Sequence, residues 1–238
     1  MPFDEPFLRE IVLIRDRIPD ARRYPFDIPA VAQLDRLSLN QPLTVLVGEN
    51  GSGKSTLLEA IAILVGINPE GGTKNFRFSA RRTESELSEA LRLVRNPRRE
   101  RHALFLRAET AFNVLTAGEG YGQSWSGLHE LSHGEAFLQM LQNHRPSGIL
   151  LLDEPEAGLS PQRQLGTLRL LHEVLEAGSQ IIMATHSPVL MAHPDAVILR
   201  LWEDGIAQTT LRGTPQFQLL HEFLERPELF VRHLLDDG

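Results

Sequence analysis

The sequence predicts an α/β fold in which a mostly parallel sheet is flanked by helices. Several apolar runs are continuous rather than alternating, as in parallel strands that are covered on both faces. Segments with helical periodicity lie between these runs, and strands that alternate with helices favour a parallel sheet. The stretch from about Lys74 to Arg145 has more helical pattern and more charge than its flanks. We therefore expect a helical lobe inserted over residues 75–145.

The apolar runs predict strands at Glu10–Ile14, Leu43–Val47, Ala103–Leu106, Ile149–Leu152, Ile181–Ala184 and Val197–Leu201. Helices are predicted at Lys54–Val65, Glu84–Arg95, His133–Asn143 and Pro161–Glu176. Thr83 and Glu86 have the spacing of a capping box, and Ser160 with Pro161 forms a typical helix start. The tail, Pro215–Leu235, predicts two short helices that are separated at Pro227.

Composition limits the classes of function. The 238 residues, 42% of them hydrophobic, are enough for a single domain with its own core over residues 1–238. A net charge of −7 opposes a surface that tracks nucleic acid along its whole length. The absence of cysteine excludes disulfides, thiolate chemistry and a cysteine-based zinc site. The acidic start, and the lack of an apolar run of roughly 18 residues, predict a cytoplasmic chain with no transmembrane segment of its own.

A glycine-rich segment follows the strand predicted at Leu43–Val47. Residues 48–55 read Gly-Glu-Asn-Gly-Ser-Gly-Lys-Ser and match the phosphate-loop (Walker A) pattern G-x-x-x-x-G-K-[ST]. Such glycines let backbone N–H groups turn toward phosphates, and the next helix adds its positive end. We expect Lys54 to contact the β- and γ-phosphates, Ser55 to bind Mg²⁺ and Thr56 to contact the α-phosphate. The cradle comprises Gly48, Glu49, Asn50, Gly51, Ser52 and Gly53. The flanking strand and helix disfavour an ordinary Gly-Ser turn.

Two acidic residues, Asp153 and Glu154, follow the apolar run Ile149–Leu152. Asp153 is the expected magnesium partner (Walker B), and Glu154 is placed to polarise a water for in-line attack on the γ-phosphate. Acidic residues also follow strands simply because the chain reaches solvent. The phosphate loop earlier in the chain favours the catalytic interpretation, and with it a P-loop NTPase that hydrolyses ATP.

Further segments resemble the ABC-type ATPases. Residues 131–135, Leu-Ser-His-Gly-Glu, are similar to the Leu-Ser-Gly-Gly-Gln signature of that family, and residues 157–160 stand where its D-loop follows the strand-end acids. Residues 185–187, Thr-His-Ser, stand at its switch histidine. The resemblance implies that His186 is a γ-phosphate sensor and a candidate catalytic residue, and the alternative is an ordinary loop histidine whose partners lie within the fold. The resemblance covers about residues 43–187 and implies an ABC-ATPase-like fold.

The likeness is greatest to small stand-alone ATPases that are grouped with AAA-labelled, SMC-like and RecF-like ATPases. It rests on residues 104–109, 129–135 and 153–156. His133 and Glu135 depart from the family's signature, and Ser160 replaces the D-loop aspartate. No glutamine follows the strand at Ala103–Leu106, so Glu109 is the candidate for the magnesium-side lid position.

The resemblance also implies a homodimer that forms on ATP binding. In the family, the signature loop of one copy closes the nucleotide site of the other, so Ser132 and Gly134 would contact the γ-phosphate bound by a second chain. Such an interface is the same on both copies. Hydrolysis would remove the shared phosphate contact and loosen the pair.

Other features keep two interpretations each. Tyr24 and Phe26 precede the phosphate-loop strand and suit either adenine stacking or core packing. His129, His133 and Glu135 suit either solvated positions or a metal cluster. Arginines between Arg81 and Arg101 suit either a solvated face or a contact for nucleic acid or an acidic partner. These are Arg81, Arg82, Arg92, Arg95, Arg98, Arg99 and Arg101.

Three functions fit these motifs. The first is a stand-alone ATPase switch with a role in nucleic-acid maintenance. The second is the ATP-binding subunit of a membrane ABC transporter, although the D-loop and lid positions depart from that pattern. The third is a nucleotide-dependent clamp with negligible turnover. The predicted cofactors are the same in all three, ATP and Mg²⁺.

Overall fold

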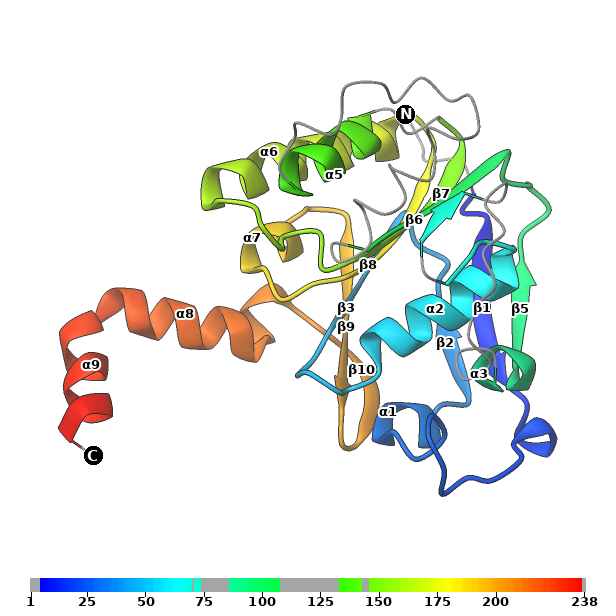
Figure 1. The fold of residues 1–238 in the computed structure, drawn as a ribbon, viewed down its shortest axis with the longest axis horizontal. Helices are drawn as coiled ribbons and strands as arrows, with labels where there is room; N and C mark the ends of the chain where they lie inside the picture. Colours follow the sequence, from blue (N-terminus) through cyan, green and yellow to red (C-terminus); the bar gives the residue numbers. More distant parts are fainter. Residues whose placement is uncertain (1–4, 70, 74–85, 108–132, 143–145, 237–238) are drawn as a thin grey trace.

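The computed structural model describes residues 5–69, 71–73, 86–107, 133–142 and 146–236. Its main element is a sheet of seven strands in the order β10-β9-β3-β8-β7-β6-β4 (Figure 1). Its five inner strands are parallel, and antiparallel strands close both edges. The strands are β3 (Leu43–Val47), β4 (Gly72–Thr73), β6 (His102–Arg107), β7 (Gly148–Asp153), β8 (Gln180–Ala184), β9 (Ala196–Trp202) and β10 (Gly205–Thr209). The predicted parallel sheet is confirmed, with boundaries within two residues at each inner strand.

A second sheet of three antiparallel strands, in the order β2-β1-β5, packs beside the first. It comprises β1 (Leu8–Leu13), β2 (Arg36–Ser38) and β5 (Leu91–Arg95). The remaining elements are η1 (Arg15–Arg17), α1 (Pro29–Ala32), α2 (Lys54–Val65), α3 (Glu86–Ala90), α5 (His133–Gln142), α6 (Pro161–Glu176), α7 (Pro188–Met191), η4 (Leu211–Gly213), α8 (Pro215–Glu225) and α9 (Pro227–Asp236).

The core lies on both faces of the large sheet, because successive side chains of a strand point to opposite faces. On one face, Leu151 and Ile182 pack with α2 and the three-stranded sheet. On the other, Leu150 and Ile181 pack with α5, α6 and α7. Figure 1 shows these two helical layers, and it shows α8 and α9 extending away from the body. Apolar side chains of these last helices are exposed, namely Leu219, Leu220, Leu224, Leu229, Val231, Leu234 and Leu235.

The helix predicted over Glu84–Arg95 is wrong in its second half. Within the described residues, α3 ends at Ala90 and the chain continues as β5. β5 pairs antiparallel with β1, and Leu91 and Leu93 lie opposite Leu13 and Ile11. The gain from completing a sheet overrides a local helical pattern. Thr83, the predicted cap, lies outside the described residues.

The other helix predictions hold. α2 and α6 have the predicted boundaries, the Ser160 hydroxyl accepts a hydrogen bond from the Arg163 N–H, and the tail is two helices that meet at Pro227. The predicted lobe over residues 75–145 contains β5 and β6, which belong to the two sheets, and α5. Residues 108–132 of that range lie outside the described chain, so the domain organisation stays a prediction.

Candidate nucleotide site

The phosphate loop spans the turn between β3 and α2. Gly51 and Gly53 have φ of +81° and +98°, in the left-handed region that glycine adopts at little cost. A Cβ on Gly53 would lie 3.0 Å from the Ile28 side chain. Gly53 is the N-cap of α2 and supplies no side chain to its first N–H groups. These donors, together with the positive end of the helix, suit a phosphate group.

Lys54 folds back over this loop. Its Nζ donates hydrogen bonds to the carbonyl oxygens of Gly48 and Glu49, each at 2.9 Å, and the residue is only 5% exposed. Burial lowers the pKa of Lys54, while the carboxylates of Glu154, Asp153 and Glu156 raise it. The two hydrogen bonds thus hold the ammonium group against the phosphate loop. The negative charge of the three carboxylates favours its charged form.

Ser55 and Asp153 lie in contact at the carboxyl-terminal ends of the parallel strands. The Ser55 hydroxyl, in the first turn of α2, donates to Asp153 Oδ1 at 3.1 Å. Asp153 ends β7 and is buried; burial raises its pKa, although the Arg107 guanidinium and the Ser55 hydroxyl lower it. A hydroxyl and a carboxylate oxygen are donors that Mg²⁺ accepts. These two predicted metal-site residues therefore lie together and fit the ion.

Glu154 adopts a backbone conformation that is unusual for its residue type. Its φ is +51°, and its N–H donates to the Ala184 carbonyl at 2.9 Å. This turn leaves the carboxylate 46% exposed, with Oε1 3.7 Å from Nε2 of His186. That separation is too long for a hydrogen bond, and Nε2 has no other partner among the described residues. The two predicted catalytic side chains are therefore neighbours.

Glu156 is a site residue that the sequence analysis did not single out. One of its carboxylate oxygens accepts a hydrogen bond from the His186 N–H at 2.6 Å, and the other accepts one from the Thr185 hydroxyl at 2.7 Å. The Ser187 hydroxyl in turn donates to Gln164 Oε1 of α6 at 2.7 Å. The segment after β8 is thus fastened to the segment after β7.

Arg107 is a second residue that was missed. Its Nε lies 3.5 Å from Asp153 Oδ2, and its Nη1 contacts Glu59 of α2 at 2.5 Å. The sequence placed each residue at the end of an apolar run, but only the structure shows that Arg107 and Asp153 end neighbouring parallel strands and face each other in register.

The structure describes some of the remaining predicted site residues and leaves others outside its described ranges. Ser132 and Glu109, like His129, Arg81 and Arg82, lie outside the described residues. Gly134 is the second residue of α5, a helix that contacts α6. Ser160 caps α6. Phe26 is buried in the core, whereas Tyr24 is 54% exposed and its hydroxyl lies 3.3 Å from that of Thr56. Core packing is therefore the role of Phe26, and Tyr24 lies beside the phosphate loop.

The predicted arginine patch is divided. Arg95 pairs with Glu100 at 2.8 Å. Arg98 donates to the Gly178 carbonyl and stacks 4.4 Å above the Phe7 ring centroid. Both side chains are engaged within the fold, while Arg92, Arg99 and Arg101 are exposed. Nucleic-acid binding by this region stays a prediction.

Comparisons with known proteins agree with this geometry. A family model described as "AAA domain, putative AbiEii toxin, Type IV TA system" matches residues 135–192, and one described as "AAA domain" matches residues 30–106. The zinc import ATP-binding protein ZnuC of Vibrio cholerae is 31% identical over 174 residues, which are 68% of this chain and 64% of that protein. The cytochrome c biogenesis ATP-binding export protein CcmA of Rhizobium johnstonii is 33% identical over 168 residues, which are 61% of this chain and 75% of that protein.

Among solved structures, the SMC head domain from Thermotoga maritima is similar at a TM-score of 0.48 and 18% identity, covering 86% of this chain and 98% of that chain. A phosphate loop with a hydroxyl–carboxylate pair on a parallel sheet defines a P-loop NTPase. The sequence relatives narrow the class: the chain belongs to the ABC-type P-loop ATPases, and its activity is the binding and hydrolysis of ATP. Among the described residues, no helix combines the length and the apolar character that crossing a bilayer requires.

Proposed function

We propose that Mg²⁺ and ATP bind at residues 48–56 and that Glu154 is the base for hydrolysis, in a site shared by two copies of the chain. The observation that carries this proposal is the contact between Ser55 and Asp153 at 3.1 Å. It joins the helix after the phosphate loop to the strand whose next residue is Glu154. A binding loop, a metal site and a base thus share one sheet edge, where parallel α/β folds bind ligands.

In this proposal, Lys54 binds phosphate. Its two hydrogen bonds to loop carbonyls hold the ammonium group over the loop. On nucleotide binding, the β- and γ-phosphate oxygens would replace these carbonyls, because an anionic acceptor makes the stronger, charge-assisted bond. Backbone N–H groups of residues 48–53 and the start of α2 would bind the other phosphate oxygens, with Thr56 at the α-phosphate.

Ser55 and Asp153 have the part of magnesium ligands, and Glu109 is proposed as a further one. When bound there, Mg²⁺ would offset the charge that develops on the β- and γ-phosphates. Arg107 opposes the effect of burial on Asp153 and favours its ionised form, through the contact of its Nε with Oδ2.

Glu154 has the part of the general base. It would accept a proton from a water whose oxygen forms a bond to the γ-phosphorus as the bond to the bridging β–γ oxygen breaks. ADP leaves with the electron pair of that bond, and the second product is inorganic phosphate. His186, next to the Glu154 carboxylate, would contact the γ-phosphate and report its presence.

A second copy would complete the site. Ser132 and Gly134 are proposed to bind the γ-phosphate held by the partner, so that ATP joins the two chains until it is hydrolysed. This part rests on the resemblance of residues 131–135 to the family signature. The chain would then act as a cytoplasmic switch that pairs with ATP and separates after turnover.

The proposal is tested by phosphate release from purified chain supplied with ATP and Mg²⁺. Glu154→Gln keeps the shape and removes the base, so we expect turnover to fall at least about 100-fold, in the range typical of a general base. Calorimetry should show nucleotide affinity within a few-fold of wild type. A variant that turns over at the wild-type rate would move the base to another residue.

The sequence relatives favour a second candidate, the ATP-binding subunit of a membrane transporter, because those relatives are named as import and export ATP-binding proteins. Two measurements separate these candidates. Turnover stimulated by added DNA or RNA supports a role in nucleic-acid maintenance. Copurification of the tagged chain with a membrane protein supports the transporter subunit.

A further inference from the structure

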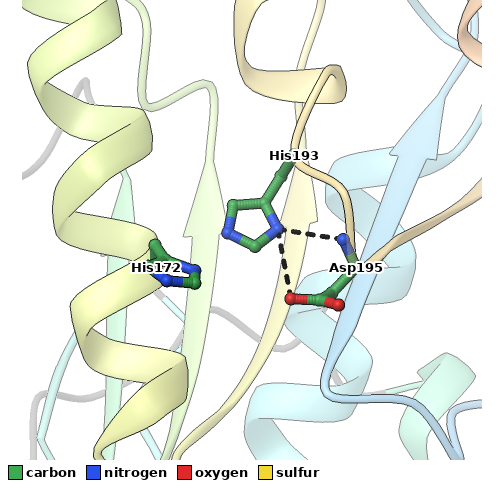
Figure 2. A group of neighbouring side chains, drawn as sticks. All are labelled: His172, His193 and Asp195. Carbon is green, nitrogen blue, oxygen red and sulfur yellow. Dashed lines mark hydrogen bonds and ion pairs between the residues drawn. The ribbon is translucent and has the colours of Figure 1, made fainter.

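Two histidines and an aspartate meet on the face of the sheet that α6 covers. His172 belongs to α6, while His193 and Asp195 lie in the turn between α7 and β9. Figure 2 shows the His193 imidazole between the other two side chains. The rings of His172 and His193 have centroids 5.5 Å apart and an interplanar angle of 39°. One potential ligand atom from each residue lies within 4.8 Å of the others.

His193 is buried, and only one of its two ring nitrogens has a hydrogen-bond partner among the described residues. The side chain is 1% exposed, and its Nδ1 accepts a hydrogen bond from the Asp195 N–H at 3.2 Å. Nε2 is buried and has no hydrogen-bond partner in the part of the chain that the structure describes. Since buried polar atoms are nearly always paired, this nitrogen indicates a missing partner. In Figure 2 it lies on the side of the ring away from Asp195, toward α6.

We propose that His172, His193 and Asp195 form a binding site for a divalent cation of the zinc type. Two imidazoles and a carboxylate are the donors that zinc takes, and a water can fill the fourth tetrahedral position. Zinc–nitrogen bonds of about 2.0–2.1 Å place two ligand nitrogens about 3.3 Å apart. The present spacing closes to that value with a small movement of His172, whose side chain is exposed and free to change rotamer.

Asp195 has two ways to contribute. Its Oδ2 lies 3.8 Å from Nδ1 of His193. If Nε2 binds the cation, the neutral ring carries its proton on Nδ1; the hydrogen bond from the Asp195 N–H is then lost, and the carboxylate accepts from Nδ1 instead, as carboxylates commonly do behind metal-bound histidines. If Nδ1 binds the cation, it gives up the same hydrogen bond, and the carboxylate on that side of the ring can bind the cation directly. Burial lowers the pKa of His193, against the opposing effect of Asp195, which favours the neutral form of its imidazole.

The site joins two segments that also bear on the nucleotide. α6 begins directly after residues 157–160, and α7 begins at Pro188, two residues after His186. A cation held by residues of α6 and of the turn after α7 would fasten these two segments a second time, in addition to the hydrogen bond between Ser187 and Gln164. Binding therefore stabilises the fold in addition to satisfying His193.

Zinc titration of the full chain, stripped of metal by a chelator and free of nucleotide, tests the proposal. Calorimetry of the wild type should show one saturable zinc ion per chain, and zinc should raise the melting temperature. His172→Ala and His193→Gln should each weaken zinc binding at least about ten-fold, the lower bound for losing a metal-supporting group. Asp195→Asn should weaken it by a similar factor.

A matched control removes a histidine elsewhere. His221 in α8 is exposed and lies 3.6 Å from Glu225, a pair that could bind zinc weakly; His221→Ala should leave the affinity unchanged. If circular dichroism shows that His193→Gln does not fold, the zinc affinity of His172→Ala tests the proposal, because His172 is exposed. Absence of saturable binding by the wild type, or a His172→Ala affinity within ten-fold of it, would overturn the proposal.

Discussion

Glu156 fastens the backbone of His186: its Oε1 accepts the His186 N–H at 2.6 Å while its Oε2 accepts the Thr185 hydroxyl at 2.7 Å. The carboxylate comes from the turn after β7 and the histidine from the turn after β8, so the contact spans the ends of two neighbouring parallel strands. Glu156 is thereby a positioning residue for His186.

Removing this carboxylate should lower turnover more than nucleotide binding. Glu156→Ala loses two hydrogen bonds to a charged acceptor, which predicts a loss of about 1.5–3 kcal/mol for each bond in the free energy of unfolding. We expect kcat to fall at least about ten-fold, with KM for ATP changed much less. Glu156→Gln keeps an acceptor and should recover part of kcat. Glu173→Ala, which breaks an exposed ion pair on α6, is the control; equal losses in both alanine variants would contradict the positioning role.

Lys54→Ala should abolish measurable ATP binding. The lysine is the buried cation of the phosphate loop, and losing charge-assisted bonds to two phosphates predicts an affinity at least about 100-fold weaker. Calorimetry with ATP and Mg²⁺ measures the affinity. The chain's other lysine supplies a control, and Lys74→Ala should bind ATP as wild type does. Undiminished affinity in Lys54→Ala would show that the nucleotide binds elsewhere.

Asp153 should make stability depend on pH. Its pKa is raised above the ordinary value of 3.8, chiefly by burial. A carboxyl with a raised pKa stabilises the fold below its unfolded pKa, and this stability is lost as pH rises through the folded pKa. Asp153→Asn should therefore raise the free energy of unfolding at pH 7 without magnesium, and the difference from wild type should shrink as pH falls toward 4.

Denaturant unfolding at several pH values measures this effect, and phosphate release should show that the same variant has lost turnover. Asp35→Asn removes an exposed carboxylate that pairs with Arg15, and its stability should follow that of wild type at every pH. An Asp153→Asn chain that is less stable than wild type at pH 7 would mean that the contact with Arg107 outweighs burial.

Glu154→Gln should also trap a dimer. Unhydrolysed ATP would keep joining the phosphate loop of one copy to Ser132 and Gly134 of the other, while the wild type exchanges quickly. Light scattering coupled to size exclusion, run with ATP and Mg²⁺, should show twice the monomer mass only for the variant. Adding Ser132→Arg fills the γ-phosphate position from the partner side and should restore the monomer. A Glu154→Gln chain that stays monomeric at high concentration would rule out the shared site.

The two left-handed glycines of the phosphate loop provide a matched pair. Gly51→Ala adds a Cβ that meets no atom of the described residues within 4 Å, so it should cost about 1–2 kcal/mol for the left-handed backbone alone. Gly53→Ala carries that strain and also brings its Cβ to 3.0 Å from Ile28, so it should be more destabilising by denaturant unfolding. Equal losses would mean that α1, which follows Ile28, moves aside freely.

The sequence by itself determined the parallel sheet, the phosphate loop and the strand-end acids. These features have local causes. The continuous apolar runs of β3 and β7 require burial on both faces of the sheet, whatever the strand order. Gly53 is needed where the backbone turns into α2, and Ser160 caps the helix that starts at the next residue. Because each signal lies within a few residues of its effect, pattern and spacing were sufficient to predict them.

Only the tertiary structure decided which distant residues meet. Residues 91–95 became β5 because β1, some eighty residues earlier, offers an edge to pair with. Arg107 reaches Asp153, and Glu156 reaches His186, because neighbouring parallel strands end at one edge of the sheet. His172 meets His193 because α6 and α7 pack on the same face. Such contacts depend on strand order and helix packing, which are set by burial of the whole core and leave no local pattern around any one residue.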